Sequence, residues 1–365
     1  MKALHDLDVK GKTVLVRLAL DAPLKKGKVA DDTRLKEALP TLRHLANAKQ
    51  VIIIGHLGRP LSKNKHLALD PIAKHLSKLL KKPIVKVDDV VPNKLPKGKF
   101  VMLENLRFDP REKANDKTLA KELAVLADIY VNDAFSVCHR KAASITGIPK
   151  YLPSYAGIHL VEELTRIGHV LQHMHHPFVL ILGGAKIDKL ELLKPLVRTA
   201  DAILIGGAMI FTFLKAQGHS IGRSYYQDDH VKLAKKIIKN KHVMLPVDIV
   251  LDTKKTVPIH KIPKSAKGLD IGKKTIKHFG DVLAEANTII WNGPMGTFRD
   301  KPFDKGTVEI AKIIIKQDAV TVAGGGDTTE SLKKYAKKFT YTSSAGGAFL
   351  ALLSGKQLPG IKALK

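Results

Sequence analysis

Cysteine is almost absent from this chain of 365 residues, and so are long apolar runs. The single cysteine, Cys138, excludes an internal disulfide framework and any metal cluster built from cysteines. No apolar run approaches the ~20 residues that a membrane-spanning helix needs. The N-terminal MKALHDLDVKGK lacks the apolar core of a signal peptide. We therefore expect a soluble, cytoplasmic protein without a membrane partner.

Arginine and aromatic residues are also scarce, although the chain is strongly basic. The formal net charge is +28, yet only 11 of the 62 basic residues are arginine, and aromatic residues make up 5%. Lysines are scattered through helix-like stretches such as VKLAKKIIKNKH, which favours a solvated surface that keeps the protein soluble. Because no arginine-rich block or repeated aromatic motif occurs, nucleic-acid binding is the less favoured alternative, which the charge leaves open.

Strand-like and helix-like segments alternate along the whole chain. Residues 14–16 and the β-branched run 51–54 are predicted as strands, and 34–48, 66–81 and 119–127 as helices, the first with Asp32 or Thr33 near its cap. Short connections between such segments favour an α/β protein built on doubly wound parallel sheets.

The alternation is interrupted once, at the Pro/Gly-rich segment IPKYLPSYAG. An amphipathic stretch follows over 158–173, and a long helix between two sheets is a natural linker and hinge. We therefore predict an N-terminal domain over 1–155, a linker helix over 156–174 and a C-terminal domain over 175–344. A tail is predicted over 345–365, and its final stretch, SGKQLPGIKALK, contains Gly and Pro and no strong helix pattern.

Basic residues gather where the predicted strands of the first half end. One of these residues, Arg34, lies on a predicted helix rather than after a strand. Its side chain could act as a mobile positive charge that follows a transferring group. The set consists of Arg17, Arg34, Arg59, Arg107 and Arg140, with His56 and His139 in the same loops. In an open α/β sheet the carboxyl ends of the strands form the ligand-binding edge. Because the arginine fork matches carboxylate and phosphate oxygens in pairs, we expect a site for a small molecule with two anionic groups.

Glycines gather at the corresponding places in the second half. GGAK over 183–186 follows a strand and opens a predicted helix, where backbone amides and the helix dipole favour phosphate. GGGDTT over 324–329 also follows an apolar strand, and Asp327 could hold Mg²⁺ on a nucleotide or merely cap a helix. No Walker A loop and no protein-kinase motif set occurs.

These loops belong to a series of motifs that covers nearly the whole chain. The series reads VLVRLALDAP, GHLGRP, LENLRF, DAFSVCHR, ILGGAKIDKL, IIWNGPMGTF, FDKGT, AGGGDT and AGGAFLALLSGKQLPG. In content and order it resembles the phosphoglycerate kinase family. The resemblance implies two Rossmann-like domains joined by a hinge helix, with the tail returning to the N-terminal domain. It also implies a monomer that transfers a phosphoryl group between 1,3-bisphosphoglycerate and ADP, giving 3-phosphoglycerate and ATP, with Mg²⁺ as cofactor.

The resemblance assigns a role to each candidate residue. The expected substrate-binding residues are Ala19, Asp21, Arg34, His56, Leu57, Gly58, Arg59, Arg107, His139 and Arg140. The expected nucleotide-binding residues are Gly183, Gly184, Lys186, Lys189, Gly206, Gly207, Asn292, Pro294, Arg299, Gly325, Gly326, Asp327 and Thr328. Asp327 takes the metal position, and the expected catalytic residues are Arg34, Lys186, Gly346 and Gly347. These roles agree with the chemistry, because phosphoryl transfer depends on positioning and charge stabilisation rather than on a covalent nucleophile.

The first motif departs from the family pattern. Where the family has VRVDFN, this chain has VRLALD, so Ala19 replaces an aspartate and Asp21 an asparagine. Because side chains alternate along a strand, we expect positions 19 and 21 to share a strand face. Asp21 would then either replace the lost aspartate or place a repulsive charge near the substrate carboxylate.

Three further departures affect the second half. Arg299 stands where the glutamate that holds the ribose is expected, and arginine cannot accept those hydrogen bonds, although Asp300 could compensate. Lys189 comes one residue early after GGAK, a spacing that still shares a helix face. Ala345 replaces the first glycine of the last turn, where alanine would disfavour a positive φ.

Two functions follow from these patterns. The favoured one is an active phosphoglycerate kinase, because the residues nearest the transferred group are retained. The alternative is a catalytically weakened relative that acts mainly as a polyanion-binding protein, as the substitutions at Ala19, Asp21 and Arg299 and the lysine-rich surface suggest. Since the two anion sites fall on different predicted domains, the favoured function requires the domains to approach and exclude water.

Overall fold

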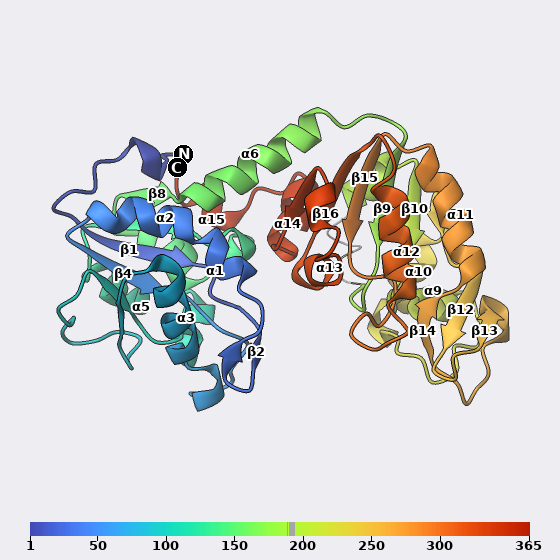
Figure 1. Cartoon of the computed structure of the whole chain (residues 1–365), viewed down its shortest axis with the longest axis horizontal. Coiled ribbons are helices and arrows are strands. Elements are labelled where there is room, and N and C mark those ends of the chain that lie inside the picture. Colours follow the sequence, from blue (N-terminus) through green and yellow to red (C-terminus); the bar gives the residue numbers. More distant parts are fainter. Residues whose placement is uncertain (188, 190–193) are drawn as a thin grey trace. The chain divides into compact units, whose positions relative to one another are not determined.

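The computed structural model describes residues 1–187, 189 and 194–365, and it divides into two compact units. Unit 1 comprises Met1–Thr165 and Gln357–Lys365, and unit 2 comprises Arg166–Lys356. Each unit is built on a six-stranded sheet of parallel strands covered by helices (Figure 1). The predicted α/β class with doubly wound parallel sheets is therefore confirmed.

The sheet of unit 1 has the strand order β5-β6-β4-β1-β7-β8. Its strands are β1 (Thr13–Leu18), β4 (Gln50–Ile54), β5 (Ile84–Lys86), β6 (Phe100–Met102), β7 (Ile129–Asp133) and β8 (Ser154–Ala156). The central β1 pairs in parallel with β4 and β7 and is buried from Val14 onward. The chain leaves β1 toward one edge and later returns to its other side at β7. A switch point therefore lies at the carboxyl ends of these strands, where such sheets bind ligands.

Proline divides two of the helices that the sequence predicts as continuous. The segment 34–48 forms α1 (Thr33–Glu37), α2 (Leu39–His44) and a short 3₁₀ turn (Leu45–Asn47), with Pro40 in the first turn of α2. The segment 66–81 forms a 3₁₀ turn (Lys65–Leu67) and then α3 (Asp70–Leu80), with Pro71 in the first turn of α3. Proline has no N–H to donate and fits only the first turn of a helix.

The remaining elements of unit 1 are short and shape the loops around the switch point. They are a hairpin of β2 (Leu24–Lys25) and β3 (Lys28–Val29), the helices α4 (Pro110–Ala114) and α5 (Lys117–Ala124), the 3₁₀ turns Leu4–Asp6, Leu106–Phe108, Phe135–Val137 and Ile148–Lys150, and a π-helical turn (Ala143–Gly147). The expected cap of α1, Asp32, makes no capping hydrogen bond and instead pairs with Lys36.

The linker helix and the tail connect the units along the chain. Helix α6 (Ile158–Gln172) leads from unit 1 into unit 2. The final stretch SGKQLPGIKALK does contain a helix, the single turn α15 (Pro359–Lys362), which the sequence pattern missed because it is so short. It packs within unit 1, where the Gly360 N–H donates to the carbonyl oxygen of Cys138 at 2.9 Å and Leu358 and Leu364 are buried.

Unit 2 contains a second parallel sheet and a smaller antiparallel one. The parallel sheet has the order β11-β10-β9-β15-β16-β17. Its strands are β9 (Phe178–Leu182), β10 (Ala202–Ile205), β11 (Val243–Met244), β15 (Thr288–Asn292), β16 (Val320–Gly324) and β17 (Tyr341–Ser343). The smaller sheet consists of β12 (Asp248–Leu251), β13 (Thr256–Pro258) and β14 (Gly268–Ile271), with β12 in the middle. The switch point of the large sheet lies between β9 and β15.

The helices described in unit 2 are α8 (Lys194–Thr199), α9 (Met209–Ala216), α10 (Val231–Ile237), α11 (Lys273–Ala284), α12 (Lys305–Ile314), α13 (Gly326–Ser331) and α14 (Gly347–Leu353), with 3₁₀ turns at Asp228–His230, Ile259–Lys261 and Ala336–Lys338. The helix predicted after GGAK falls largely on residues 188 and 190–193, which lie outside the described residues. In the part of the chain that the structure describes, no helix is long and apolar enough to cross a membrane.

Candidate active site

The loops at the switch point of unit 1 bring the predicted basic residues into one electrostatic environment. Residues 19–21 follow β1, 55–59 follow β4, 103–107 follow β6 and 134–140 follow β7. Arg107 is repelled by Arg140, and Arg140 by Arg59, so their charges lie close enough to influence one another. Burial is the larger cause, and together with this repulsion it lowers the pKa of Arg107 to about 10. The site therefore concentrates positive charge.

Asp21 is contacted by the loop after β4 and by helix α1. Its Oδ1 accepts a hydrogen bond from the Gly58 N–H at 2.8 Å, and its main-chain oxygen accepts one from Arg34 at 2.6 Å. Its Oδ2 lies 3.6 Å from the Arg34 guanidinium and 3.8 Å from Nε2 of His56. The negative charge of Asp21 is thus balanced by Arg34, and its carboxylate holds the Gly58 loop in place.

Ala19 lies in an apolar environment. It is buried with Ala134, Val137 and Ile145. The expectation that positions 19 and 21 share a strand face is wrong, because β1 ends at Leu18 and both residues lie in the loop after it. A turn with a hydrogen bond from the Ala22 N–H to the Leu20 oxygen directs this loop instead.

Asn105, which was not among the predicted residues, and Arg17, one of the predicted basic residues, hold neighbouring groups of the site in place. Asn105 binds both polar groups of the Leu57 backbone, and Arg107 donates to the Gly58 oxygen at 2.5 Å. Arg17 is fully buried and donates to Nδ1 of His56 at 2.7 Å. Asn105 and Arg17 both belong to motifs quoted above, so their position in those motifs was the available signal.

The two histidines of the site are neutral at pH 7. Burial, reinforced by the charge of Arg17, lowers the pKa of His56 well below its usual value. Because arginine can only donate, Nδ1 of His56 must accept from Arg17 and cannot carry a proton. Burial and the charge of Arg140 lower the pKa of His139 to about 4, and its Nδ1 has no hydrogen-bond partner among the described residues. The positive charge of the site is therefore carried by arginine.

A cavity of about 340 Å³ extends behind these arginines. Besides Arg17, Arg107 and Arg140, it is lined by Lys113, Lys141, Glu112, Val137, Ala142 and Ile145. The buried Glu112 accepts hydrogen bonds from the backbone and hydroxyl of Ser144 at 2.9 and 2.6 Å. The Ser144 hydroxyl in turn accepts from Nε of Arg17 at 3.2 Å. This chain of contacts fixes the guanidinium that faces His56.

In unit 2 the glycine loops pack backbone against backbone. The Gly184 N–H donates to the Pro294 oxygen at 2.9 Å, and the Gly207 N–H donates to the Met295 oxygen at 2.8 Å. A Cβ atom at Gly183 would lie 2.2 Å from the Pro294 oxygen, and Gly207 adopts a φ of +64°. These glycines therefore allow three loops to meet at the switch point, which leaves backbone rather than side chains facing a ligand.

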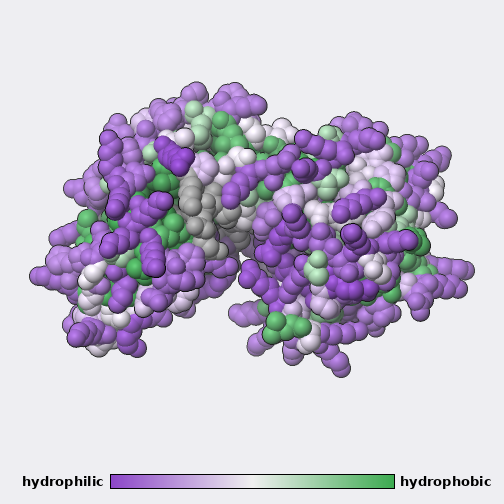
Figure 2. Space-filling model, turned by 180° about the vertical axis from the view of Figure 1, so that it is seen from behind, coloured by the Kyte–Doolittle hydropathy of each residue, from purple (hydrophilic) through white to green (hydrophobic). Residues whose placement is uncertain are grey.

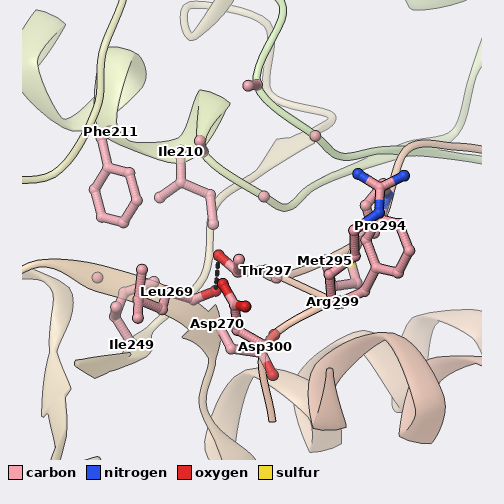
Figure 3. Close-up of a pocket in the computed structure, with 17 residues that line it drawn as sticks. Ile210, Phe211, Ile249, Leu269, Asp270, Pro294, Met295, Thr297, Arg299 and Asp300 are labelled. Carbon is pink, nitrogen blue, oxygen red and sulfur yellow. Dashed lines mark hydrogen bonds between the residues drawn. The ribbon is translucent and has the colours of Figure 1, made fainter. Parts of the chain in front are cut away.

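The loops enclose a cavity of about 390 Å³ that reaches the antiparallel sheet. Ile210, Phe211 and Ile249 form an apolar wall, and Asp270 and Asp300 add carboxylates (Figure 3). Pro294 and Arg299 also line this cavity, as do Gly184 and Gly207. An apolar cavity with a few polar groups has the character of a site for a flat, partly polar ligand such as a nucleoside.

Some of the predicted nucleotide residues also hold the loops together. Asn292 is buried, with its amide donating to the Gly324 oxygen and its Oδ1 accepting from Lys189 at 2.7 Å. The Thr328 hydroxyl donates to the Gly324 oxygen and accepts from the Gly293 N–H, both at 2.8 Å. Gly325, with a φ of +109°, immediately precedes α13, and Gly326 and Asp327 lie in the first turn of that helix.

The remaining candidates in unit 2 are exposed or lie at helix starts. Lys186 is exposed and makes no hydrogen bond or ion pair with any described residue. Gly206 follows β10 and contacts Met295 closely, while Gly346 precedes α14 and Gly347 begins it. Ala345 is not among the residues with positive φ, so the alanine is accommodated without strain.

Fold and site together define a two-unit α/β protein, with a cationic site in one unit and a glycine-lined cavity in the other. A family model described as phosphoglycerate kinase matches residues 4–356. The phosphoglycerate kinase of Pelotomaculum thermopropionicum is 43% identical over 387 residues, covering 100% of this chain and 98% of that one. That of Aquifex aeolicus is 43% identical, covering 98% and 96%.

Solved structures give the same answer. The phosphoglycerate kinase of Pyrococcus horikoshii has a TM-score of 0.88 at 32% identity, covering 100% of this chain and 98% of that one. That of Coxiella burnetii has a TM-score of 0.79 at 35% identity, covering 99% and 98%. This chain belongs to the phosphoglycerate kinase family.

The low pKa of His139 predicts that anion binding is linked to proton uptake. A bound anion should offset the repulsion from Arg140 and raise this pKa from about 4 toward neutrality. Affinity should then increase as the pH falls through the raised value, and this increase should end below about 4. Calorimetry of 3-phosphoglycerate binding in two buffers of different ionisation enthalpy measures the protons taken up. Since the ligand phosphate also titrates, His139→Gln is the control, and equal uptake by both proteins would contradict the prediction.

Proposed function

We propose that this chain catalyses reversible phosphoryl transfer between 1,3-bisphosphoglycerate and MgADP, giving 3-phosphoglycerate and MgATP. The observation that supports it is the presence of two complementary loop sets, one cationic and one glycine-rich, each at the switch point of a parallel sheet. Arginine recognises carboxylate and phosphate groups, and glycine loops let a backbone approach a nucleotide. One chain supplies both sets, so the proposal requires only a monomer, which we infer acts in the cytoplasm.

In unit 1, the arginines would hold the two anionic groups of the substrate. Arg34 is the one that lies on a helix, and its contacts to Asp21 direct its guanidinium toward the Gly58 loop. We infer that Asp21 orders this loop and that its charge is offset by Arg34, rather than simply repelling the substrate carboxylate.

In unit 2, Lys186 and the start of α14 would stabilise the migrating phosphoryl group. The Lys186 ammonium has no partner among the described residues, so it can neutralise charge that develops during transfer. The Gly347 N–H belongs to the first turn of α14, where backbone amides lack acceptors within the helix. Neither group needs to form a covalent intermediate.

Magnesium fits this site as part of a metal–nucleotide complex. No group of three or more His, Cys, Asp or Glu side chains that could hold a metal by itself is found in residues 1–187, 189 and 194–365. Mg²⁺ commonly binds to one or two carboxylates together with substrate phosphates, and Asp327 offers an exposed carboxylate in the first turn of α13. When bound, the ion would neutralise phosphate charge.

Replacing Lys186 by alanine tests the catalytic assignment. Because loss of one charge-stabilising group costs about two to three orders of magnitude in rate, Lys186→Ala should lower kcat by that factor. The control is Lys150→Ala, an exposed lysine of unit 1, which should keep the wild-type rate. A coupled assay with 3-phosphoglycerate and MgATP gives both rates. Full activity of Lys186→Ala would refute its role, and absence of turnover by well-folded wild type would refute the function.

Transfer also requires the two loop sets to approach each other, because they lie on separate units. We infer that the units close when both ligands are bound, which excludes water from the reaction. Small-angle scattering should give a smaller radius of gyration with 3-phosphoglycerate and MgADP together than with either alone. An unchanged radius would argue against closure.

A second function, in addition to catalysis, is favoured by one lysine-rich segment of unit 2. Residues 253–280 contain eight lysines and a single carboxylate, Asp270, which is buried. The lysines are Lys254, Lys255, Lys261, Lys264, Lys267, Lys273, Lys274 and Lys277, all exposed and without an ion pair to any described residue. Hydrophilic residues dominate the face of the molecule seen in Figure 2, which agrees with such a solvated surface.

Part of this segment forms a compact basic end of the antiparallel sheet. The turn that carries Lys254 and Lys255 is joined to Lys267, whose oxygen accepts from the Asp252 N–H at 2.7 Å. Arg223 pairs with the Asp252 carboxylate at 3.1 Å, and Tyr225, two residues further along the chain, has 53% of its surface exposed. Exposed lysines and an exposed aromatic ring suit a single-stranded nucleic acid, because lysines bind its phosphates and aromatic rings stack on its bases.

Charge reversal at this end of the sheet tests the second function. Lys254→Glu/Lys255→Glu/Lys267→Glu should weaken binding of a fluorescent single-stranded oligonucleotide and lower the slope of log K against log salt by about two, since each lost phosphate contact contributes roughly 0.7. The matched control is Lys117→Glu/Lys121→Glu/Lys150→Glu, which changes net charge equally on exposed lysines of unit 1. Equal losses in both variants would mean that only net charge matters.

A further inference from the structure

Arg299 reaches from the nucleotide cavity to the carboxylate proposed to hold magnesium. It lies in the loop after β15, lines the cavity, and stacks its guanidinium 4.6 Å from the centre of the Phe298 ring. Figure 3 shows this guanidinium pointing away from Asp270 and Asp300. Its charge is therefore directed to the start of α13 rather than into the cavity.

Two carboxylates of α13 accept hydrogen bonds from this guanidinium, and they accept different numbers of them. Glu330 accepts from Nε at 3.2 Å and from a terminal nitrogen at 2.5 Å. Asp327 accepts a single hydrogen bond, from the same terminal nitrogen, at 3.1 Å. Because Glu330 holds the guanidinium through two nitrogens, the contact with Asp327 can break while Arg299 stays in place.

We propose that Arg299 competes with Mg²⁺ for the Asp327 carboxylate and neutralises it whenever a nucleotide arrives without metal. This inference rests on the proposed function, in which Asp327 meets the metal of MgADP. A metal-free nucleotide brings phosphate charge toward Asp327, and the arginine offsets that repulsion. A magnesium-bound nucleotide brings its own cation, so the same arginine must give up Asp327. Arg299 thus narrows the difference in affinity between ADP and MgADP.

The quantity that tests this role is the ratio of two dissociation constants, that of ADP in EDTA divided by that of MgADP. In Arg299→Gln, Asp327 no longer pairs with a guanidinium. Metal-free ADP should then bind more weakly, because its phosphates are repelled by Asp327. MgADP should bind more tightly, because Mg²⁺ no longer competes with Arg299 for Asp327. Because exposed ion pairs contribute little individually, the ratio should increase about two- to fivefold. Isothermal titration calorimetry measures both constants without turnover. Arg299 is largely exposed, and MgADP binding by the variant itself reports that it is folded.

A nearby lysine provides the matched control. Lys301→Gln also removes one positive charge from this loop, but the Lys301 ammonium pairs with Asp304 instead of Asp327. Its ratio should equal that of the wild type. In Glu330→Gln the guanidinium loses its second anchor and shifts toward Asp327, so the ratio should stay the same or decrease.

The outcomes separate this inference from the function on which it rests. Wild type that fails to bind MgADP would overturn both. Normal MgADP binding with an unchanged ratio in Arg299→Gln would overturn only the competition for Asp327. An equal increase in Lys301→Gln would show that general loop charge, and not the contact with Asp327, sets the ratio.

Discussion

Parallel hydrogen bonding between neighbouring strands is the constraint on which both sites depend. In unit 1, Arg17 on β1 is in register with Ile54 on β4 and Asn132 on β7. The loops that follow these strands therefore start at the same edge of the sheet. Residues more than a hundred positions apart in the chain therefore lie close together there, because the pairing of the strands brings their loops to the same edge. The same arrangement in unit 2 brings the loops after β9, β10, β15 and β16 to one edge.

The two edges are filled by different means. In unit 1, charged side chains are held by other polar side chains, as Arg17 is by Ser144 and the Gly58 loop is by Asp21. In unit 2, the absence of side chains lets loops hydrogen-bond through their backbones, as Gly184 does with Pro294. An anionic sugar acid requires concentrated positive charge, whereas a nucleotide requires a cavity wall and accessible backbone amides.

Each of these sites contains one substitution that introduces a charge opposite in sign to the charged side chains around it. Asp21 introduces a carboxylate among arginines, and Arg299 introduces a guanidinium beside carboxylates. In each case the new charge is balanced locally, by Arg34 in unit 1 and by Asp327 and Glu330 in unit 2. Such pairing limits the effect of each substitution on the field at its site. Both residues can therefore act on loop order and ligand preference while the family's fold is kept.

The amino-acid sequence by itself determined the alternation of strands and helices, the order of the motifs and the family, because these depend on local periodicity and residue identity. It also placed the cations and glycines at strand ends, although their individual roles stay predictions. Only the tertiary structure decided that Ala19 packs in an apolar cluster, that Arg17 makes His56 an acceptor, and that Arg299 meets Asp327. These outcomes depend on where a strand ends and on which loops a sheet brings together, and neither is encoded in any one segment.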